Sequence, residues 1–156
     1  MNELKKYLWV GFISMLPIIE LRGAIPIGVG MGLPVLPTYI IAVLCNMIPV
    51  PFILLFAPPV LRWCTKIPKV GGIFTWIENK GVKAKAKLEE KVGFYQYVAL
   101  CTFVAIPLPG TGAWTGSLGA ALLKLDFWKA VLAVMLGVLF AGVIMGVTSV
   151  GVLNLF

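Results

Sequence analysis

The sequence predicts an all-α integral membrane protein with two inverted repeats, each a re-entrant helical hairpin followed by a transmembrane helix, joined by a basic amphipathic cytoplasmic helix. Of the 156 residues, 60% are hydrophobic and 12% are charged, about half the charged fraction of a soluble domain. Eight of the 13 lysines and arginines lie in residues 62–92. Two long apolar stretches are interrupted by proline and glycine. This length gives one membrane domain, residues 1–156.

Residues 7–36 form the first interrupted stretch, which contains Pro17, Pro26 and Pro34. Proline lacks the N–H of a continuous helix and clashes with the preceding turn. Two arms of about 15 residues would each be about 22 Å long, which suits a hairpin that enters the bilayer and returns. Residues 38–61 then match the ~20 residues that a transmembrane helix needs.

A second repeat, residues 93–156, follows the same order as the first, residues 7–61. Its interrupted stretch is residues 93–123, and a shift of 90 residues places Pro17 on Pro107. Interrupted hydrophobic segments at matching places in two halves indicate the binding site of a transporter.

Two topologies remain open at this point. If residues 7–36 and 93–123 are re-entrant, two full crossings remain and the hairpins enter from opposite faces. If both stretches cross fully, the N-terminus with Lys5 and Lys6 is cytoplasmic. We favour the re-entrant arrangement, because a straight helix through closely spaced prolines and glycines is costly.

The basic linker, residues 62–92, is expected on the cytoplasmic side, because lysine and arginine accumulate in cytoplasmic loops. This position between apolar stretches argues against a nucleic-acid partner. Apolar and small residues at helical spacing, with lysines between them, predict an amphipathic helix lying on an anionic lipid surface; the simpler interpretation is a solvated connector that this apolar stripe anchors. These residues are Ile73, Ile77, Gly81, Ala84, Leu88 and Val92.

Histidine is absent, and the three cysteines have neither a close pair nor metal-binding spacing. These features remove the commonest metal ligand and exclude a Ser-His-Asp triad. We therefore expect no metal and no cofactor, and a protein that is not an enzyme.

Glu20 and Arg22 are the main candidate site residues, since they are the only charges in residues 7–36. Charges at membrane depth cost at least ~2.5 kcal/mol each and usually face a cavity or a partner. We interpret Arg22 as the ligand of an oxyanion and Glu20 as a proton carrier. Gly23 and Pro26 complete this candidate site. The alternative is a structural ion pair between Glu20 and Arg22. Such a pair requires extended backbone at these positions, because residues i and i+2 of an extended chain point to the same side.

The second interruption is the other half of the predicted site. Free N–H groups at a broken helix start can bind an anion, threonine hydroxyls can add ligands, and a tryptophan can stack on a ligand or pack. The alternative is a tight turn that allows close helix contact. The residues are Pro107, Pro109, Gly110, Thr111, Gly112, Trp114 and Thr115.

Asn46 lies in the middle of an apolar stretch and either faces the cavity or makes an interhelical hydrogen bond. Gly142 and Gly146 form a GxxxG pair, which we interpret as a packing surface within the chain or between protomers. A homodimer therefore remains open.

The segments Glu20-Leu-Arg-Gly-Ala-Ile-Pro-Ile-Gly28 and Pro107-Leu-Pro-Gly-Thr-Gly-Ala-Trp114 resemble the small multidrug export protein family of prokaryotes. That family is similar, more distantly, to the DedA (VTT-domain) membrane proteins. The resemblance implies paired re-entrant hairpins in a multi-pass protein of the bacterial or archaeal plasma membrane. Its DedA side implies proton-coupled transport of lipid-linked phosphates such as undecaprenyl phosphate. Proteins of the DedA type carry arginine in the second hairpin region, where this chain has no charge between Lys91 and Lys124.

Taken together, these observations favour a proton-coupled translocase of an anionic, lipid-linked phosphate-like substrate, acting through a site between two broken hairpins. Its expected partners are membrane lipids, the anionic lipid or small-molecule substrate, and protons. Two alternatives remain: a proton-coupled small multidrug exporter, and a scaffold or assembly protein that does not transport.

Overall fold

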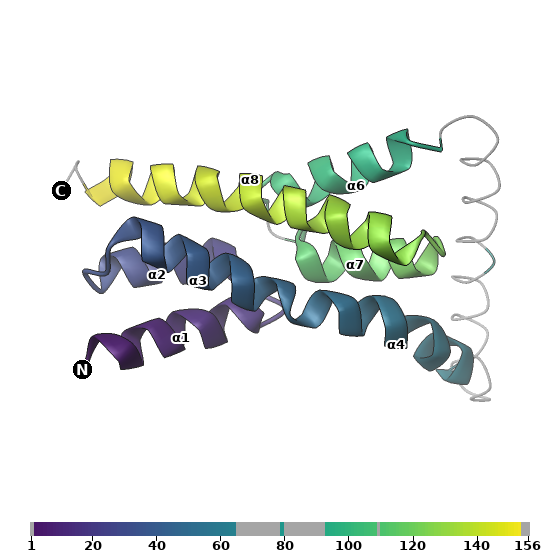
Figure 1. Ribbon diagram of the computed structural model, residues 1–156, viewed down its shortest axis with the longest axis horizontal. Coiled ribbons are helices and arrows are strands. Elements are labelled where there is room, and N and C mark those ends of the chain that lie inside the picture. Colours follow the sequence, from purple (N-terminus) through teal and green to yellow (C-terminus); the bar gives the residue numbers. More distant parts are fainter. Residues whose placement is uncertain (1, 65–78, 80–92, 109, 154–156) are drawn as a thin grey trace.

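The computed structural model describes residues 2–64, 79, 93–108 and 110–153. These residues contain helices and no strand, which confirms the all-α prediction (Figure 1). The predicted amphipathic linker helix and Pro109 lie largely or wholly outside the described residues. The helices are α1 (Glu3–Met15), α2 (Glu20–Gly30), α3 (Val35–Met47), α4 (Pro49–Cys64), α6 (Tyr95–Ala105), α7 (Ala113–Leu122) and α8 (Phe127–Leu153).

Two stretches of helix are long and apolar enough to cross a membrane, Val35–Val60 and Phe127–Val152. The first comprises α3 and most of α4, which meet at Ile48, where the chain reaches Pro49. The second is almost all of α8. The first coincides with residues 38–61, which the sequence assigns to a transmembrane helix, and the second lies where the order of the repeat places the matching helix, after residues 93–123.

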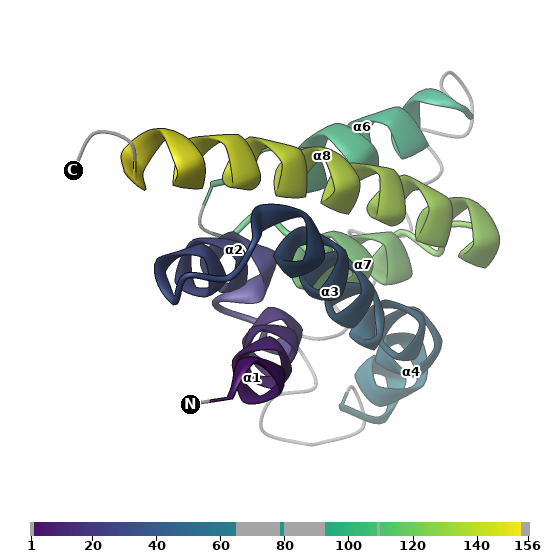
Figure 2. The same ribbon diagram turned by 60° about the vertical axis from the view of Figure 1, so that its left-hand side comes forward.

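The shorter helices form two hairpins. The α1–α2 hairpin lies along one half of α8, and the α6–α7 hairpin along the other half (Figures 1 and 2). Helix α1 also packs on α3, and α7 packs on α4. In Figure 1, α1 and α6 run in opposite directions, and the two turns meet near the middle of the molecule.

The first hairpin turns at Pro17. Helix α1 ends at Met15, and Leu16 takes an extended conformation, as the residue before a proline prefers. Helix α2 then begins at Glu20 and continues through Pro26 to Gly30. The prediction that Pro26 interrupts residues 7–36 was therefore wrong: neighbouring protein can make an interior proline tolerable in a membrane helix.

The second hairpin turns where the sequence predicts it. Helix α6 ends at Ala105, and Ile106 is extended before Pro107. Helix α7 begins at Ala113. Gly110 has φ +86°, a left-handed conformation that glycine adopts without the steric cost of a side chain.

Small residues allow the helices to approach closely. A Cβ on Gly11 of α1 would lie 2.9 Å from the Cys45 sulfur of α3. Likewise, a Cβ on Gly137 of α8 would lie 2.7 Å from the Cys101 carbonyl oxygen of α6. One on Gly142 would lie 2.6 Å from the Tyr39 ring. The GxxxG glycine Gly142 therefore packs against α3 within the chain.

Candidate functional site

The two hairpin turns enclose a cavity of about 360 Å³, which is the candidate site. We call it the hairpin cavity. Both turns contribute to its lining, and α8 adds one side chain. The lining residues are Pro17, Ile18, Ile19, Glu20, Arg22, Gly23, Pro107, Gly110, Thr111, Gly112, Thr115 and Met145.

The Glu20 carboxylate caps the start of α7. It is only 5% exposed, and its Oε1 accepts a hydrogen bond from the backbone N–H of Trp114 at 3.1 Å. Free N–H groups at a helix start carry partial positive charge and favour an anion. Glu20 itself has φ +51°, an uncommon backbone conformation for a residue with a side chain. The position that sequence analysis assigned to a bound anion is thus occupied by a carboxylate of the protein.

Gly112 makes this contact possible. A Cβ built on Gly112 would overlap the Glu20 carboxylate, whose atoms are the three nearest to it. The backbone of Gly112 is extended, with φ −163° and ψ −170°, so conformational freedom is not what requires glycine here. The requirement is space for the carboxylate.

Arg22 caps the other side of the turn of the second hairpin, at the end of α6. Its Nη2 donates to the carbonyl oxygens of Ile106 at 3.0 Å and Val104 at 3.2 Å, and its Nη1 donates to the carbonyl oxygen of Leu108. These carbonyls lie at and just beyond the end of α6, where partial negative charge favours a cation. The planar guanidinium presents several donors in a fixed geometry, so one side chain serves three acceptors.

Glu20 and Arg22 therefore each hydrogen-bond to the second hairpin, while their opposite charges attract each other without a close contact. Among the contacts of the described residues, no ion pair joins them, and each charge has backbone partners from residues 104–114. Both residues belong to α2, where positions i and i+2 do not face each other. The extended backbone that would aim both side chains to one side is not formed, and the ion-pair interpretation was wrong in that respect.

Trp114 completes a reciprocal contact. Its indole Nε1 donates to the carbonyl oxygen of Met15 at 3.1 Å, and Met15 is the last residue of α1. Each hairpin thus sends a donor side chain to the end of the other hairpin's first helix, Arg22 to α6 and Trp114 to α1. The Trp114 side chain does not belong to the lining of the hairpin cavity.

The threonines of the second turn bond within that turn. Thr111 Oγ1 donates to the carbonyl oxygens of Ile106 at 2.7 Å and Leu108 at 2.9 Å. Thr115 Oγ1 accepts from the Gly112 N–H at 2.9 Å. Both residues also line the hairpin cavity, so their hydroxyls stabilise its wall and remain near any bound group.

Two other predicted site residues lie away from the hairpin cavity: Pro26 is within α2, and Asn46 is in α3. Asn46 is 0% exposed, and neither its side-chain nitrogen nor its oxygen has a hydrogen-bond partner among the described residues. Sequence reasoning missed Met145, whose approach from α8 has no local signal. It also missed the backbone carbonyl groups that Arg22 binds, because every residue has a carbonyl group and the sequence does not distinguish these from the others.

These features describe a helical protein with two membrane-capable stretches of helix and a cavity lined by charged and polar residues between two helical hairpins. Comparison with known families matches residues 20–144 to the family described as "Putative small multi-drug export protein". Because this match covers most of the sequence, the chain belongs to that family. No curated protein and no solved structure matches it.

Proposed function

We propose that the protein is a proton-coupled transporter that moves an anionic group, of the lipid-linked phosphate type, through the hairpin cavity. One observation carries the proposal: the Glu20 carboxylate occupies the N-terminus of α7, where the backbone would otherwise bind an anion. A carboxylate in that position competes directly with an anionic substrate. Transport rather than catalysis fits a site of two charges and backbone groups.

The proposed membrane topology is a pair of inverted re-entrant hairpins. Helix α1 has 13 residues and α6 has 11, giving lengths of about 20 Å and 17 Å, well short of the ~30 Å hydrocarbon core. The opposite directions of α1 and α6 in Figure 1 also fit an inversion. With the basic linker in the cytoplasm, the hairpins would enter from opposite faces of a bacterial or archaeal plasma membrane.

Equivalent positions support the repeat. A shift of 90 residues places Gly11 on Cys101, and a shift of 92 places Cys45 on Gly137. These four residues form the two close crossings of α1 with α3 and of α6 with α8. The turn between α6 and α7, residues 106–112, is longer than the turn between α1 and α2, residues 16–19, so positions after the turn match at a larger shift.

The shift of 92 also places Glu20 on Gly112 and Arg22 on Trp114. In each pair the two residues contact the opposite hairpin: Glu20 lies against Gly112, and Arg22 and Trp114 cap opposite first helices. The matching positions of the second hairpin hold neutral residues where the first hairpin has charges. The cavity is therefore lined by one acidic residue, Glu20, and one basic residue, Arg22.

The coupling follows from the charges. When Glu20 takes up a proton, its attraction for the α7 N-terminus falls, and the N–H of Trp114 becomes available to an anion. Arg22 supplies the cationic partner when it leaves the α6 carbonyls. Loss of the anion and then of the proton returns Glu20 to its cap. Proton and substrate thus alternate at one helix terminus.

Two alternatives rest on specific observations. The family description favours export of small drugs, although Arg22 would repel a cationic drug. The bonding of Arg22 to three carbonyls favours a non-transporting scaffold, in which the two charges only hold the hairpins together.

Purified protein in proteoliposomes distinguishes these functions. We expect flipping of a fluorescent undecaprenyl phosphate-type lipid, driven by a pH gradient, and no export of a cationic dye. Glu20→Gln should abolish the dependence on the pH gradient while the protein stays folded. Dye export without lipid flipping would favour the exporter. Absence of both activities, with both single variants Glu20→Gln and Arg22→Lys merely less stable, would favour the scaffold.

A further inference from the structure

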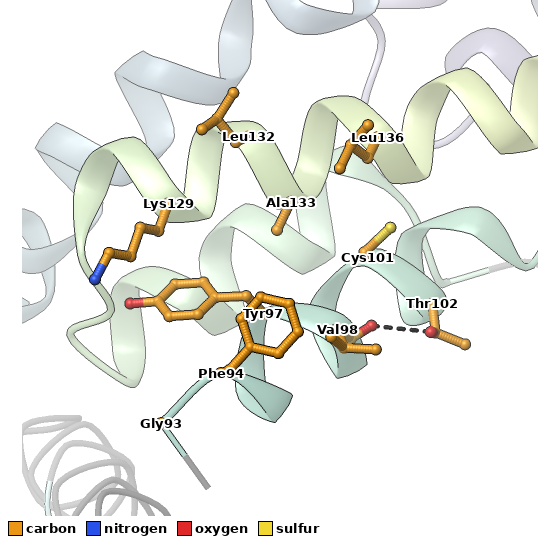
Figure 3. A pocket seen from close by; sticks show the side chains of 10 residues that line it. All are labelled: Gly93, Phe94, Tyr97, Val98, Cys101, Thr102, Lys129, Leu132, Ala133 and Leu136. Carbon is orange, nitrogen blue, oxygen red and sulfur yellow. Dashed lines mark hydrogen bonds between the residues drawn. The ribbon is translucent and has the colours of Figure 1, made fainter.

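A second cavity, of about 550 Å³, lies on the outer side of the second repeat between α6 and α8. We call it the α6–α8 groove. Figure 3 shows its lining, which comes from the first two turns of α6, the residue pair before it and the first turns of α8. The lining residues are Gly93, Phe94, Tyr97, Val98, Cys101, Thr102, Lys129, Leu132, Ala133 and Leu136.

Most of this groove is apolar. Thr102 is its polar residue at the deep end, and the Thr102 hydroxyl donates to the carbonyl oxygen of Val98 at 2.9 Å (Figure 3). That bond satisfies the hydroxyl within α6 and leaves a wall without free donors. From Lys129 to Leu136 the wall extends about 10 Å along α8. A surface of this kind accepts a hydrocarbon chain.

Polar groups gather at the other end of the groove. Lys129 Nζ lies 5.9 Å from the centre of the Tyr97 ring, and Figure 3 shows the Tyr97 hydroxyl at the same end. The Tyr97 oxygen accepts the Asp126 N–H at 3.2 Å, which leaves its hydroxyl proton free to donate. Asp126 Oδ1 accepts the Lys129 N–H at 3.1 Å, and among the described residues Lys129 Nζ has no carboxylate partner. An ammonium and a hydroxyl donor are thus available to an anion.

This end of the groove has the character of a membrane interface. Phe94, Tyr95 and Trp128 are exposed there, and aromatic side chains concentrate at the level of lipid headgroups. It is also the end of the molecule at which α4 finishes and α6 starts (Figure 1), and the basic linker, which we propose to be cytoplasmic, lies between these two helices in the sequence. Basic pockets between membrane helices on the cytoplasmic side bind anionic lipid headgroups.

From this geometry we infer that the α6–α8 groove binds an anionic glycerophospholipid, with one acyl chain along α6 and α8 and the phosphate held by Lys129 and Tyr97. The groove is separate from the hairpin cavity, with which it shares no lining residue. The inference therefore does not depend on the proposed transport function. A lipid bound here would hold α6 against α8 and so support the second hairpin from outside.

Native mass spectrometry of the full chain, released from detergent, tests the headgroup. The probes are phosphatidylglycerol and phosphatidylcholine with identical acyl chains. We expect phosphatidylglycerol to bind more tightly, and Lys129→Gln to weaken it about fivefold, as expected for one lysine near a lipid phosphate. Lys129→Arg should keep the binding. Lys5→Gln removes the same charge from α1, outside this groove, and should leave the binding unchanged.

A second pair of variants tests the acyl chain. Val98→Phe narrows the groove and should weaken both lipids, whereas Val147→Phe enlarges an exposed residue of α8 outside it and should have no effect. Four results would overturn the inference: equal affinity for the two lipids, equal losses in Lys129→Gln and Lys5→Gln, unchanged binding in Val98→Phe, or a dimer that Val98→Phe dissociates. The last result would identify a second copy of the chain as the occupant. Circular dichroism confirms that each variant is folded.

Discussion

Gly112→Ala isolates the contact between Glu20 and α7. Alanine adopts the extended backbone of Gly112 without strain, so its only large effect is that the new Cβ displaces the Glu20 carboxylate. The displaced carboxylate loses its 3.1 Å hydrogen bond from the Trp114 N–H. A hydrogen bond to a charged group contributes about 1.5–3 kcal/mol. A loss of about 2 kcal/mol corresponds to a fall of about 4–8 °C in Tm for a chain of this size.

The assay is thermal unfolding in detergent micelles, followed by circular dichroism. Gly119→Ala is the matched control, because Gly119 lies in the same helix and a Cβ there meets nothing within 4 Å. Alanine in place of an interior helix glycine should stabilise by about 0.5–1 kcal/mol. Opposite signs for two identical substitutions in one helix would exclude a general effect of alanine on α7.

A double-mutant cycle supplies the decisive comparison. In a Glu20→Ala background the carboxylate is gone, so Gly112→Ala should cost little. The coupling between the two positions should then be about 1.5–3 kcal/mol. An equal penalty in both backgrounds would refute the reasoning, since it would mean that some other group occupies the space beside Gly112. Wild-type stability of Gly112→Ala alone would refute it as well.

Three further predictions concern other contacts. Trp114→Phe removes the hydrogen bond to the Met15 carbonyl and should lower the free energy of unfolding by about 1 kcal/mol; an unchanged Tm would show that the indole N–H does not hold α1. Asn46→Leu replaces a buried, unpartnered amide with an apolar group of similar size, so it should raise stability by about 1–3 kcal/mol. Reduced stability in that variant would mean that Asn46 has a partner in the membrane-embedded protein. A cysteine at Lys85, in a background without other cysteines, should resist an impermeant maleimide in intact cells if the basic linker is cytoplasmic, and rapid labelling would reverse the orientation.

Local chemistry in the sequence was sufficient to locate the two turns. Pro17 and Pro107 end their helices because each forces the residue before it out of the helical conformation. The apolar stretch that follows each hairpin likewise became helix of membrane-spanning length, because length and composition decide that outcome. Pro26 shows where such reasoning fails, since the helix continues through it. Packing against other helices, which a local pattern does not contain, determines whether an interior proline breaks a helix.

The candidate site was predictable in composition but not in geometry. That Glu20 and Arg22 require polar surroundings follows from the cost of charge at membrane depth. Their partners are backbone groups more than 80 residues away in the chain, and nothing in the local sequence distinguishes those groups from any others. A direct ion pair between Glu20 and Arg22, which the sequence left open as an alternative, is not formed among the described residues. The reason for glycine at position 112 is visible only in the structure: its backbone is extended, and the missing side chain leaves space for the Glu20 carboxylate.

The arrangement of caps bears on whether the charges serve stability or transport. Glu20 and Arg22 stabilise the turn of the second hairpin from both sides, since one lies at the α7 N-terminus and the other at the end of α6. A transporter that used the same two groups would have to release both caps, at a cost of about 1.5–3 kcal/mol for each charged hydrogen bond. Protonation of Glu20 and binding of an anion by Arg22 would each offset one of those losses. A substrate without negative charge would leave the Arg22 cap in place, so the same bonds that hold the hairpins together would select for an anion.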